Sequence, residues 1–454
     1  MTKFQSKLSG VEGIAWPPLA TGLPASLAAL MHQLEETQWL PADEIAQHQH
    51  RQLIKLAAHA AKHSPYFRSR LQAAGVRPDQ LSGMEGLRSI PVMTRRELQS
   101  AGEHLFCRQL PPAHMPAGET KSSGSTGEPV VVKRTAINQL FWLAAAMRDH
   151  LWQQRDFLGT LAVIRMNYPA GNSESQDSWG APASLFFKTG PSHAMRITTD
   201  IGQQAKWLED INPDCLLTYP TNLAALLQQL EQRGIKLPRL RQVRSIGETL
   251  TPGIRDATRK SLGVEISDTY SSNEVGTIAL QCPESGMYHI MSESLLVEVL
   301  DEHGNPCLPG QVGRVVITDL HNFATPLIRY DNGDYAEAGT ACPCGRGLPT
   351  LKRIAGRERN MLLLPDGRRW PAIGNYRVRE IAPIRQYQII QRNRETIEVR
   401  LVSDTPLTDG QETRLKEVIH ESLEFPFQLQ FVYFPGNIPR GPGGKLEEFI
   451  CEAS

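Results

Sequence analysis

The chain has 454 residues, which is too long for one compact core and predicts two or three domains. Hydrophobic residues make up 40% and charged residues 21%, the mix of an ordinary globular protein. The 48 basic residues balance the 48 acidic ones, and this balance argues against a protein that binds nucleic acid or an anionic membrane.

The sequence also lacks the usual signals for membrane insertion and export. No stretch reaches the roughly 18 consecutive apolar residues of a membrane-spanning helix, and residues 1–13 lack the apolar centre of a signal peptide. We therefore expect a cytoplasmic protein whose seven cysteines stay reduced. Clustered cysteines then indicate metal ligands or nucleophiles.

The first elements in chain order are helices, expected over much of residues 26–109. Apolar residues at helical spacing over 52–74 predict one helix that ends at Gly75. Thr94, which follows a proline-containing segment, predicts the capped start of another helix.

Between residues 130 and 335 the sequence alternates between strands and helices. The strands include 161–164 and 215–218, and the helices include 221–233 and 251–262. This alternation predicts α/β layers around a largely parallel sheet.

The last third of the chain predicts a hairpin and then a small separate unit. Residues 295–300 and 313–318 flank a turn rich in Gly, Pro and Asn, which is typical of a β-hairpin. After residue 356 we expect strands at 387–391, 396–402 and 428–434 and a helix at 410–423. The predicted fold class is α/β: a large N-terminal domain of layered sheets and helices over 1–357, and a small α+β C-terminal domain over 358–454.

The segment KSSGSTGEP at 121–129 is a candidate phosphate-binding loop. Its glycines and hydroxyl residues can present backbone N–H groups and hydroxyls to one anion. The candidate residues are Ser122, Ser123, Gly124, Ser125, Thr126 and Gly127. A flexible turn is the commoner explanation of such a segment, and the spacing differs from the P-loop motif G-x-x-x-x-G-K-[ST].

Four further motifs follow this loop. They are IGE at 246–248, DTYSSNEVG at 268–276, LIRYDNGD at 327–334 and IPRGPGGK at 438–445. In order and approximate spacing, the five motifs resemble those of the adenylate-forming superfamily of acyl-CoA synthetases, aryl-CoA ligases and peptide-synthetase adenylation domains. The segments IPVMTRREL and CPCGRGLP, and GETL in place of GAPL, make the phenylacetate–CoA ligase branch the nearer resemblance.

The resemblance implies that the protein activates a carboxylic acid with ATP and Mg²⁺. The acid would form an acyl-adenylate with release of pyrophosphate, and the acyl group would then pass to a thiol of CoA or of a carrier-protein phosphopantetheine. Such an enzyme must neutralise the triphosphate and hold the two anions in line. The resemblance also implies that the small domain is mobile. We expect that the protein can form a homodimer.

The resemblance also assigns roles to single residues. Tyr270 would lie against the adenine, Asp334 would accept hydrogen bonds from the ribose, and Glu274 would hold Mg²⁺. Lys445 would bridge the attacking carboxylate and the α-phosphate, so Lys445 and Glu274 are the predicted catalytic residues. The remaining predicted nucleotide contacts are Gly247, Glu248, Asp268 and Arg357.

The sequence departs from the family pattern at two places. Where relatives carry a hinge aspartate, this chain reads Glu358-Arg359-Asn360, and Arg359 could serve because a hinge needs backbone freedom more than one side chain. The lysine that often follows the Ser/Gly loop is replaced by valines, with Lys133 next.

Three cysteines and one histidine form a candidate zinc site. Cys342 and Cys344 flank one proline, and Cys282 precedes His289 by seven residues. Three thiols and one imidazole suit tetrahedral zinc, although C-x-C is tighter than the usual spacing and four unrelated residues in two loops is an equal alternative. Members of the resembled branch share this arrangement, which favours a closed structural site.

The substrate is expected to be a small aryl or arylacetic acid. The available aromatic side chains are Phe141, Trp142, Tyr168, Trp179 and Tyr219, and core packing explains them equally well. Three alternatives stay open: a nucleotide- or ligand-binding protein that keeps the fold with reduced catalysis, adenylation with a non-thiol acceptor, and a zinc-dependent hydrolase.

Overall fold

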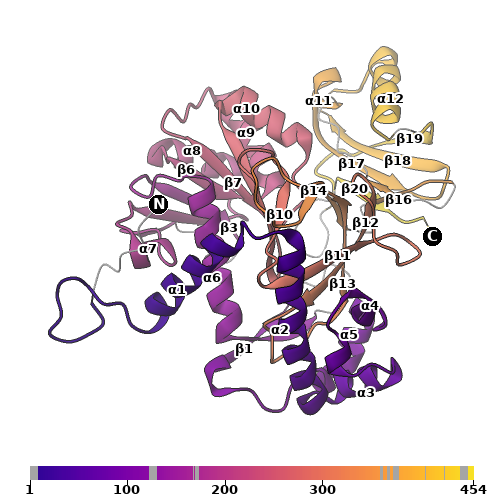
Figure 1. The fold of residues 1–454 in the computed structure, drawn as a ribbon. Helices are drawn as coiled ribbons and strands as arrows, with labels where there is room; N and C mark the ends of the chain where they lie inside the picture. Colours follow the sequence, from indigo (N-terminus) through magenta and orange to yellow (C-terminus); the bar gives the residue numbers. More distant parts are fainter. Residues whose placement is uncertain are drawn as a thin grey trace.

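The computed structural model describes residues 9–121, 130–166, 168, 173–357, 361–365, 369–371, 378–403, 405–423, 425–439 and 448–453. In these ranges no helix combines the length and apolar character that crossing a membrane requires. Figure 1 shows a large body that contains the N-terminal helices and a long sheet, with a smaller unit at the upper right.

The chain opens with helices, as predicted. Their bounds are α1 Gly22–Thr37, α2 Ala42–His63, α3 Pro65–Ala73, α4 Met84–Arg88 and α5 Arg95–Ala101, with 3₁₀ turns at Pro78–Gln80, Gly102–Leu105 and Pro112–His114. Leu53, Leu56 and Phe67 are fully buried in one core cluster with Val315 and Tyr330 of the sheet. The helical opening therefore packs on the sheet.

The single helix predicted over 52–74 is wrong, because the chain breaks at Ser64 and Pro65. Ser64 has an extended backbone (φ −106°, ψ 118°), and its hydroxyl accepts the N–H of Phe67. Pro65 has no N–H to donate to the preceding turn, so it starts a new helix instead of continuing the old one.

The central sheet of the described chain has twelve strands. Their order is β11-β12-β13-β14-β10-β9-β8-β7-β6-β3-β5-β4. The bounds are β3 Leu161–Arg165, β4 Glu174–Gln176, β5 Ser192–Arg196, β6 Cys215–Thr218, β7 Gln242–Ile246, β8 Glu265–Ser272, β9 Gly276–Gln281, β10 Tyr288–Ile290, β11 Leu295–Leu300, β12 Val312–Asp319, β13 Tyr330–Ala338 and β14 Thr350–Arg357.

This sheet is mixed, whereas the sequence predicted a largely parallel one. Strands β5, β3, β6, β7 and β8 are parallel neighbours. All neighbouring pairs in the part of the sheet with the order β11-β12-β13-β14-β10-β9-β8 are antiparallel, and so is the pair of β4 with β5. Parallel neighbours need crossover connections, and helices supply them in the first half of the sheet, while shorter turns join the antiparallel strands.

Helices cover both faces of the parallel half. They are α6 Ala136–Trp152, α7 Ala183–Phe186, α8 Ile201–Ile211, α9 Pro220–Arg233 and α10 Pro252–Leu262. Leu208, Leu226 and Ile254 of α8 to α10 pack on Leu216 and Val243. Helix α6 lies on the opposite face, where Asp149 of the helix pairs with Arg244 of β7 at 2.9 Å.

A hairpin precedes α6. Strands β1 Ala117–Lys121 and β2 Val131–Thr135 pair antiparallel, with Lys121 opposite Val131. The candidate phosphate loop at 122–129 connects these two strands and lies outside the described residues. Thr135 caps α6 by accepting the N–H of Asn138.

The C-terminal unit is a small α+β structure, as predicted. Its four-stranded sheet has the order β19-β18-β17-β20. The bounds are β15 Met361–Leu363, β16 Arg369–Pro371, α11 Val378–Ile381, β17 Ile384–Gln391, β18 Thr396–Ser403, α12 Asp409–Leu423, β19 Gln428–Tyr433 and β20 Phe449–Cys451. Leu415 and Ile419 of α12 pack on Ile389 and Val399 of this sheet.

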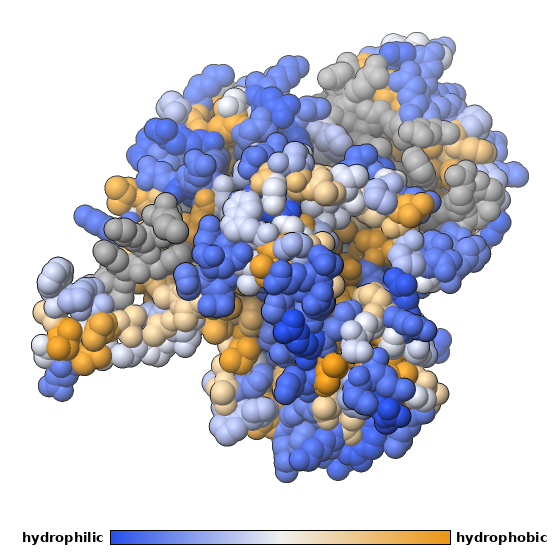
Figure 2. Space-filling model, in the orientation of Figure 1, coloured by the Kyte–Doolittle hydropathy of each residue, from blue (hydrophilic) through white to orange (hydrophobic). Residues whose placement is uncertain are grey.

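Large apolar side chains are exposed around the segment that precedes and begins α1. They are Val11, Ile14, Trp16, Leu19 and Leu23. This segment projects at the lower left of Figure 1, and Figure 2 shows orange side chains at the same end of the molecule.

Candidate functional site

Three strands bring together the predicted nucleotide contacts Tyr270, Asp334 and Arg357. The Tyr270 hydroxyl donates to Asp334 Oδ2 at 2.8 Å, and the Asn332 amide donates to the same oxygen at 2.8 Å. Arg357 Nε lies 3.7 Å from Asp334 Oδ1, because Asp334 and Arg357 are register partners of β13 and β14. The sequence reasoning did not include Asn332, which also donates to the Tyr270 oxygen at 2.9 Å.

Burial raises the pKa of Asp334 to about 6. Arg357 and the Tyr270 hydroxyl oppose this rise, while the carboxylates of Glu274 and Asp331 add to it. The carboxylate can accept more hydrogen bonds than Tyr270 and Asn332 supply. A vicinal diol, which offers two hydroxyl donors, suits this arrangement.

Glu274 is buried and forms an ion pair with Arg95, a residue that the sequence reasoning missed. Arg95 Nη1 lies 3.3 Å from Glu274 Oε1. Arg95 begins α5, and Met93 just before it pairs with Tyr330 at the start of β13. The N-terminal helical region thereby contributes a cation beside the predicted magnesium ligand.

Gly247 and Glu248 follow β7, at the edge of the sheet where ligands of open α/β sheets usually bind. Gly247 has φ +78°, and a Cβ at this position would lie 3.1 Å from the Tyr219 ring. Glu248 Oε2 accepts hydrogen bonds from the Thr221 N–H at 3.0 Å and from its hydroxyl at 2.8 Å. The ends of β6 and β7 are thus held close together.

Asp268 lies inside the sheet, where described residues occupy both of its carboxylate oxygens. Ser245 donates to Oδ1 at 2.5 Å, and the Tyr288 hydroxyl donates to Oδ2 at 2.8 Å. Burial raises its pKa. Asp268 therefore ties β8 to β7 and β10, and its contact with a nucleotide stays a prediction.

Several predicted residues lie outside the described part of the chain. They are Ser122, Ser123, Gly124, Ser125, Thr126, Gly127, Glu358, Arg359, Asn360 and Lys445. Lys133, which stands after the valines of the phosphate loop, is described: its ammonium lies 3.5 Å from Glu103 and over the Phe106 ring.

The aromatic candidates divide into separate groups. The Arg134 guanidinium lies over the Trp142 ring. Tyr168 packs against the apolar cluster that Val163, Ala194, Leu217 and Ile246 form on the parallel strands. Trp179 instead donates to the carbonyl of Gly159, just before the N-terminal end of β3, and contacts the Phe157 ring. Trp179 therefore lies toward the opposite edge of the sheet from Gly247.

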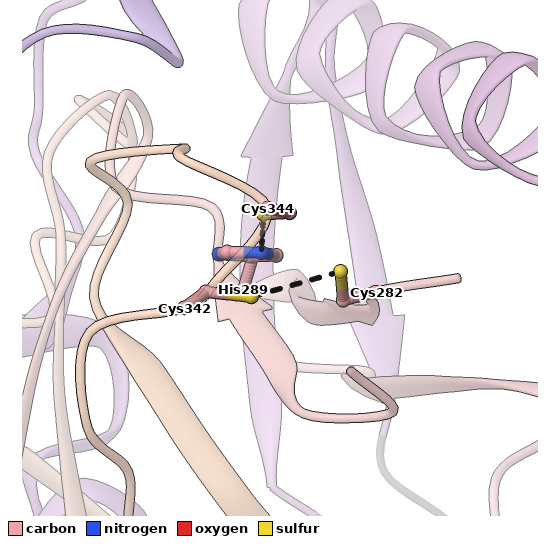
Figure 3. Close-up of side chains that lie close together, drawn as sticks. All are labelled: Cys282, His289, Cys342 and Cys344. Carbon is pink, nitrogen blue, oxygen red and sulfur yellow. Dashed lines mark hydrogen bonds between the residues drawn. The ribbon is translucent and has the colours of Figure 1, made fainter. Parts of the chain in front are cut away.

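Cys282, His289, Cys342 and Cys344 converge in space, as Figure 3 shows. Their ligand atoms all lie within 4.8 Å of one another. The Cys342 and Cys282 sulfurs are 3.7 Å apart, and the Cys344 sulfur is 3.3 Å from His289 Nε2. Ligands of a tetrahedral zinc with Zn–S bonds of about 2.3 Å are separated by about 3.8 Å, so the spacing fits this ion.

The surroundings of His289 also fit a metal ligand. Its Nδ1 lies 3.2 Å from the Leu348 carbonyl, which leaves Nε2 directed at the cysteines. Burial lowers the pKa of His289 to about 4, which keeps the imidazole in the neutral form that binds metals. Pairing of β10 with β14 brings the two halves of this set together.

Comparisons with known proteins agree with this fold. No family model matches the chain. The structure of 2-hydroxyisobutyryl-CoA ligase in the postadenylation state, in complex with 2-HIB-AMP, is similar with a TM-score of 0.72 and 19% identity over 92% of both chains. The chain therefore shares the fold of this acyl-CoA ligase, with a large N-terminal part built on a mixed sheet and a small α+β C-terminal part.

The chain is also similar to phenylacetate-coenzyme A ligases. The enzyme of Thermus thermophilus is 26% identical over 453 residues, which cover 93% of this chain and 99% of the relative. The enzyme of Escherichia coli is 26% identical over 348 residues, 73% of this chain and 75% of the relative. These matches confirm the resemblance on which the sequence predictions rest.

Proposed function

We propose that this protein is an AMP-forming acid–thiol ligase. It would convert a carboxylic acid and ATP to an acyl-adenylate and pyrophosphate, and then transfer the acyl group to CoA or to a carrier-protein phosphopantetheine. The observation that carries this proposal is the cluster of Tyr270, Asn332, Asp334 and Arg357, with Glu274 close to it. Acid-dependent release of pyrophosphate from ATP tests it.

Each group in the cluster has a chemical task in the proposed reaction. Asp334 accepts hydrogen bonds from the ribose hydroxyls, and Arg357 opposes the rise in the pKa of this carboxylate that its burial causes. Glu274 would hold Mg²⁺, which neutralises charge on the triphosphate when bound. We assign the phosphates to the loop at 122–129 and the reacting carboxylate to Lys445.

The proposed domains are residues 1–357 and 358–454, with the hinge at 358–360. Strand β14 of the large sheet ends at Arg357, and strand β15 begins at Met361. A hinge at this point lets the small domain bring Lys445 to the nucleotide for the first step and leave for the second.

An aryl or arylacetic acid is the proposed substrate. The named relatives are phenylacetate–CoA ligases, and Trp142, Tyr168 and Tyr219 offer aromatic surfaces close to the carboxyl ends of the strands. Aromatic rings stack favourably on one another and can add about 1 kcal/mol beyond the burial of their surface.

We propose that the cysteine and histidine set holds one structural zinc ion. Its four ligands leave no open position, so zinc would fasten the β9–β10 turn to the loop before β14 without entering the reaction. Cys282 follows the end of β9, His289 lies on β10, and Cys342 and Cys344 come from the loop before β14.

Replacing Cys344 by serine is expected to remove bound zinc and to lower the melting temperature by about 4 °C or more, the shift that about 2 kcal/mol produces in a large domain. Elemental analysis and thermal unfolding measure both effects. Cys307→Ser is the matched control, because Cys307 lies outside the set. Wild-type protein that contains no zinc would contradict the proposal.

The affinity for adenosine is expected to fall about tenfold per pH unit below pH 6. Adenosine carries the ribose diol but no phosphate to titrate, and Asp334 must be ionised to accept both hydroxyls. The pKa of Asp334 is raised to about 6, so the ionised form is present above this pH and is lost as the pH falls through it. Calorimetry from pH 5 to 8 measures the affinity. Asp334→Asn should bind more weakly with a flat pH profile, and a flat profile in the wild type would contradict the assignment.

A further inference from the structure

Two arginines lie side by side at the carboxyl edge of the parallel strands. Arg165 ends β3, Arg196 ends β5, and the two are register partners in this parallel pair. Partners on neighbouring strands direct their side chains to the same face, with the strands about 4.8 Å apart. Two guanidinium groups therefore start from adjacent points on one face.

Neither guanidinium has a carboxylate partner among the residues that the structure describes. The Nε atoms of both lack a hydrogen-bond partner among the described residues, as does the Nε of Arg155, and a terminal nitrogen of Arg196 lies 4.0 Å from the Met166 sulfur. The buried Arg148, Arg155 and Arg329, in contrast, each bind a carboxylate at 2.8 to 2.9 Å. Because two like charges in proximity repel, a bound anion would stabilise this pair.

The acidic residues around the pair are engaged or distant. Glu174 of β4 stands opposite Ala194 and is exposed, and no ion pair within 4.0 Å joins it to either arginine. Asp200 caps α8 by accepting the N–H groups of Gly202 and Gln203. The one nearby imidazole, His193, alternates to the other face and contacts the Ser175 hydroxyl at 2.7 Å. No described side chain supplies the counter-charge.

The same face is apolar just behind the arginines. Val163 and Ala194 stand two residues before them on β3 and β5, and these side chains form one buried cluster with Leu217, Ile246 and the partly buried Tyr168. An apolar cluster therefore lies directly beside the two cations on this face.

The arginines lie at a suitable distance from the proposed nucleotide site. Strand β6 separates β3 from β7, so Arg165 lies about 10 Å across the strand ends from Gly247. The carboxylate that attacks the α-phosphate has to lie at the nucleotide and cannot reach so far. A second anionic group at the far end of the same acid can.

We infer that Arg165 and Arg196 bind a second carboxylate of the acid substrate. The substrate class is then a dicarboxylic acid with an apolar, preferably aromatic, middle part. One carboxylate is activated at the nucleotide, and the other pairs with the two guanidinium groups, whose planar donors match a carboxylate in a bidentate manner. This inference rests on the proposed function and specifies its substrate.

The test compares two acids of similar shape, 1,4-phenylenediacetate and 4-methylphenylacetate, in ATP–pyrophosphate exchange. The wild type is expected to use the diacid at least about tenfold better, measured as kcat/KM. Arg165→Gln and Arg196→Gln should each lower this value for the diacid by about 10- to 100-fold, the effect of losing hydrogen bonds to a charged group. The value for the monoacid should change less than about twofold.

Arg241→Gln is the matched control, because it removes one exposed positive charge just before β7, at the opposite edge of the same sheet. It should leave both acids unaffected. Calorimetric binding of the diacid in the absence of ATP separates this inference from the proposed function. Binding that is lost in Arg165→Gln, without any exchange, would support the inference and contradict the proposed function.

Two results would overturn the inference. In the first, the wild type exchanges pyrophosphate equally well with the monoacid and the diacid, and Arg165→Gln and Arg196→Gln change both values equally. This result would leave the proposed function intact and remove the role of the arginine pair. Absence of diacid binding and of diacid-dependent exchange in the wild type would also remove it.

Discussion

Replacing Lys445 by alanine is expected to lower ATP–pyrophosphate exchange by about 100- to 1000-fold, the usual effect of removing one group that stabilises charge in a transition state. Lys445 closes the motif IPRGPGGK, which the resemblance places at the reacting carboxylate and the α-phosphate. The substitution should leave adenosine binding and the melting temperature unchanged, because these depend on the large domain.

Lys416→Ala is the control for this prediction, because Lys416 is an exposed lysine on α12 of the same small unit. It should exchange pyrophosphate at the wild-type rate. Exchange in Lys445→Ala at a rate close to wild type would show that the proposed catalytic role is wrong.

Replacing Arg329 by methionine is expected to lower the free energy of unfolding by about 3 kcal/mol, because it leaves the buried Glu298 carboxylate with only Arg88, whose Nε lies 4.0 Å away. Arg329 Nε lies 2.9 Å from Glu298 Oε2. Its terminal nitrogen donates to the carbonyls of Ile90 at 2.7 Å and Arg88 at 3.0 Å. Urea denaturation measures the effect.

Arg314→Met is the matched control for Arg329. Arg314 pairs with Asp331 at 3.4 Å in a more exposed position, so its loss should cost less than about 1 kcal/mol. The double replacement of Arg329 and Glu298 by methionine should recover part of the loss, because it removes the unpaired charge. Equal losses for Arg329→Met and Arg314→Met would contradict the structural role of Arg329.

This role also shows that the residues of one motif can serve different purposes. Arg329 and Asp334 both belong to LIRYDNGD, yet Arg329 holds the segment before α5 against the start of β13. That segment carries Arg95 to Glu274. Arg329 therefore holds the segment before α5 on the sheet, and Arg95 of α5 connects the N-terminal helices to Glu274.

Local signals were sufficient for most of the secondary structure. Thr251, Pro252 and Gly263 mark the two ends of α10, and the predicted bounds differ from the observed ones by one residue. The break at Ser64 and Pro65 also had a local signal, because proline cannot continue a helix, but the apolar spacing across it suggested continuity. The antiparallel half of the sheet was visible only in the hairpin at 295–318.

The site was harder to predict because its residues meet through strand register. Asp334 and Arg357 are partners only because β13 and β14 pair as they do, with two irregularities along the pair. Both residues were predicted from the family resemblance, because their spacing in the sequence does not indicate that they meet. Arg95 lies 179 residues from Glu274, and no local pattern connects the two.

The four candidate zinc ligands could be predicted in part from the sequence. Cys342 and Cys344 are neighbours in one loop, and Cys282 and His289 are close in one hairpin, so each half could be recognised in the sequence. Their meeting depends on the pairing of His289 with Thr350 in the sheet. Only the structure shows that the four ligand atoms converge.

ATP–pyrophosphate exchange in the absence of CoA tests the central claim most directly. The panel contains aryl, arylacetic, cinnamic and fatty acids, together with the diacid described above, and adenosine binding is measured on the same preparation. We expect exchange that depends on arylacetic acids and that is lost in Lys445→Ala. Protein that binds adenosine but exchanges no pyrophosphate with any acid of the panel would contradict the proposed ligase and indicate a nucleotide-binding protein without this chemistry.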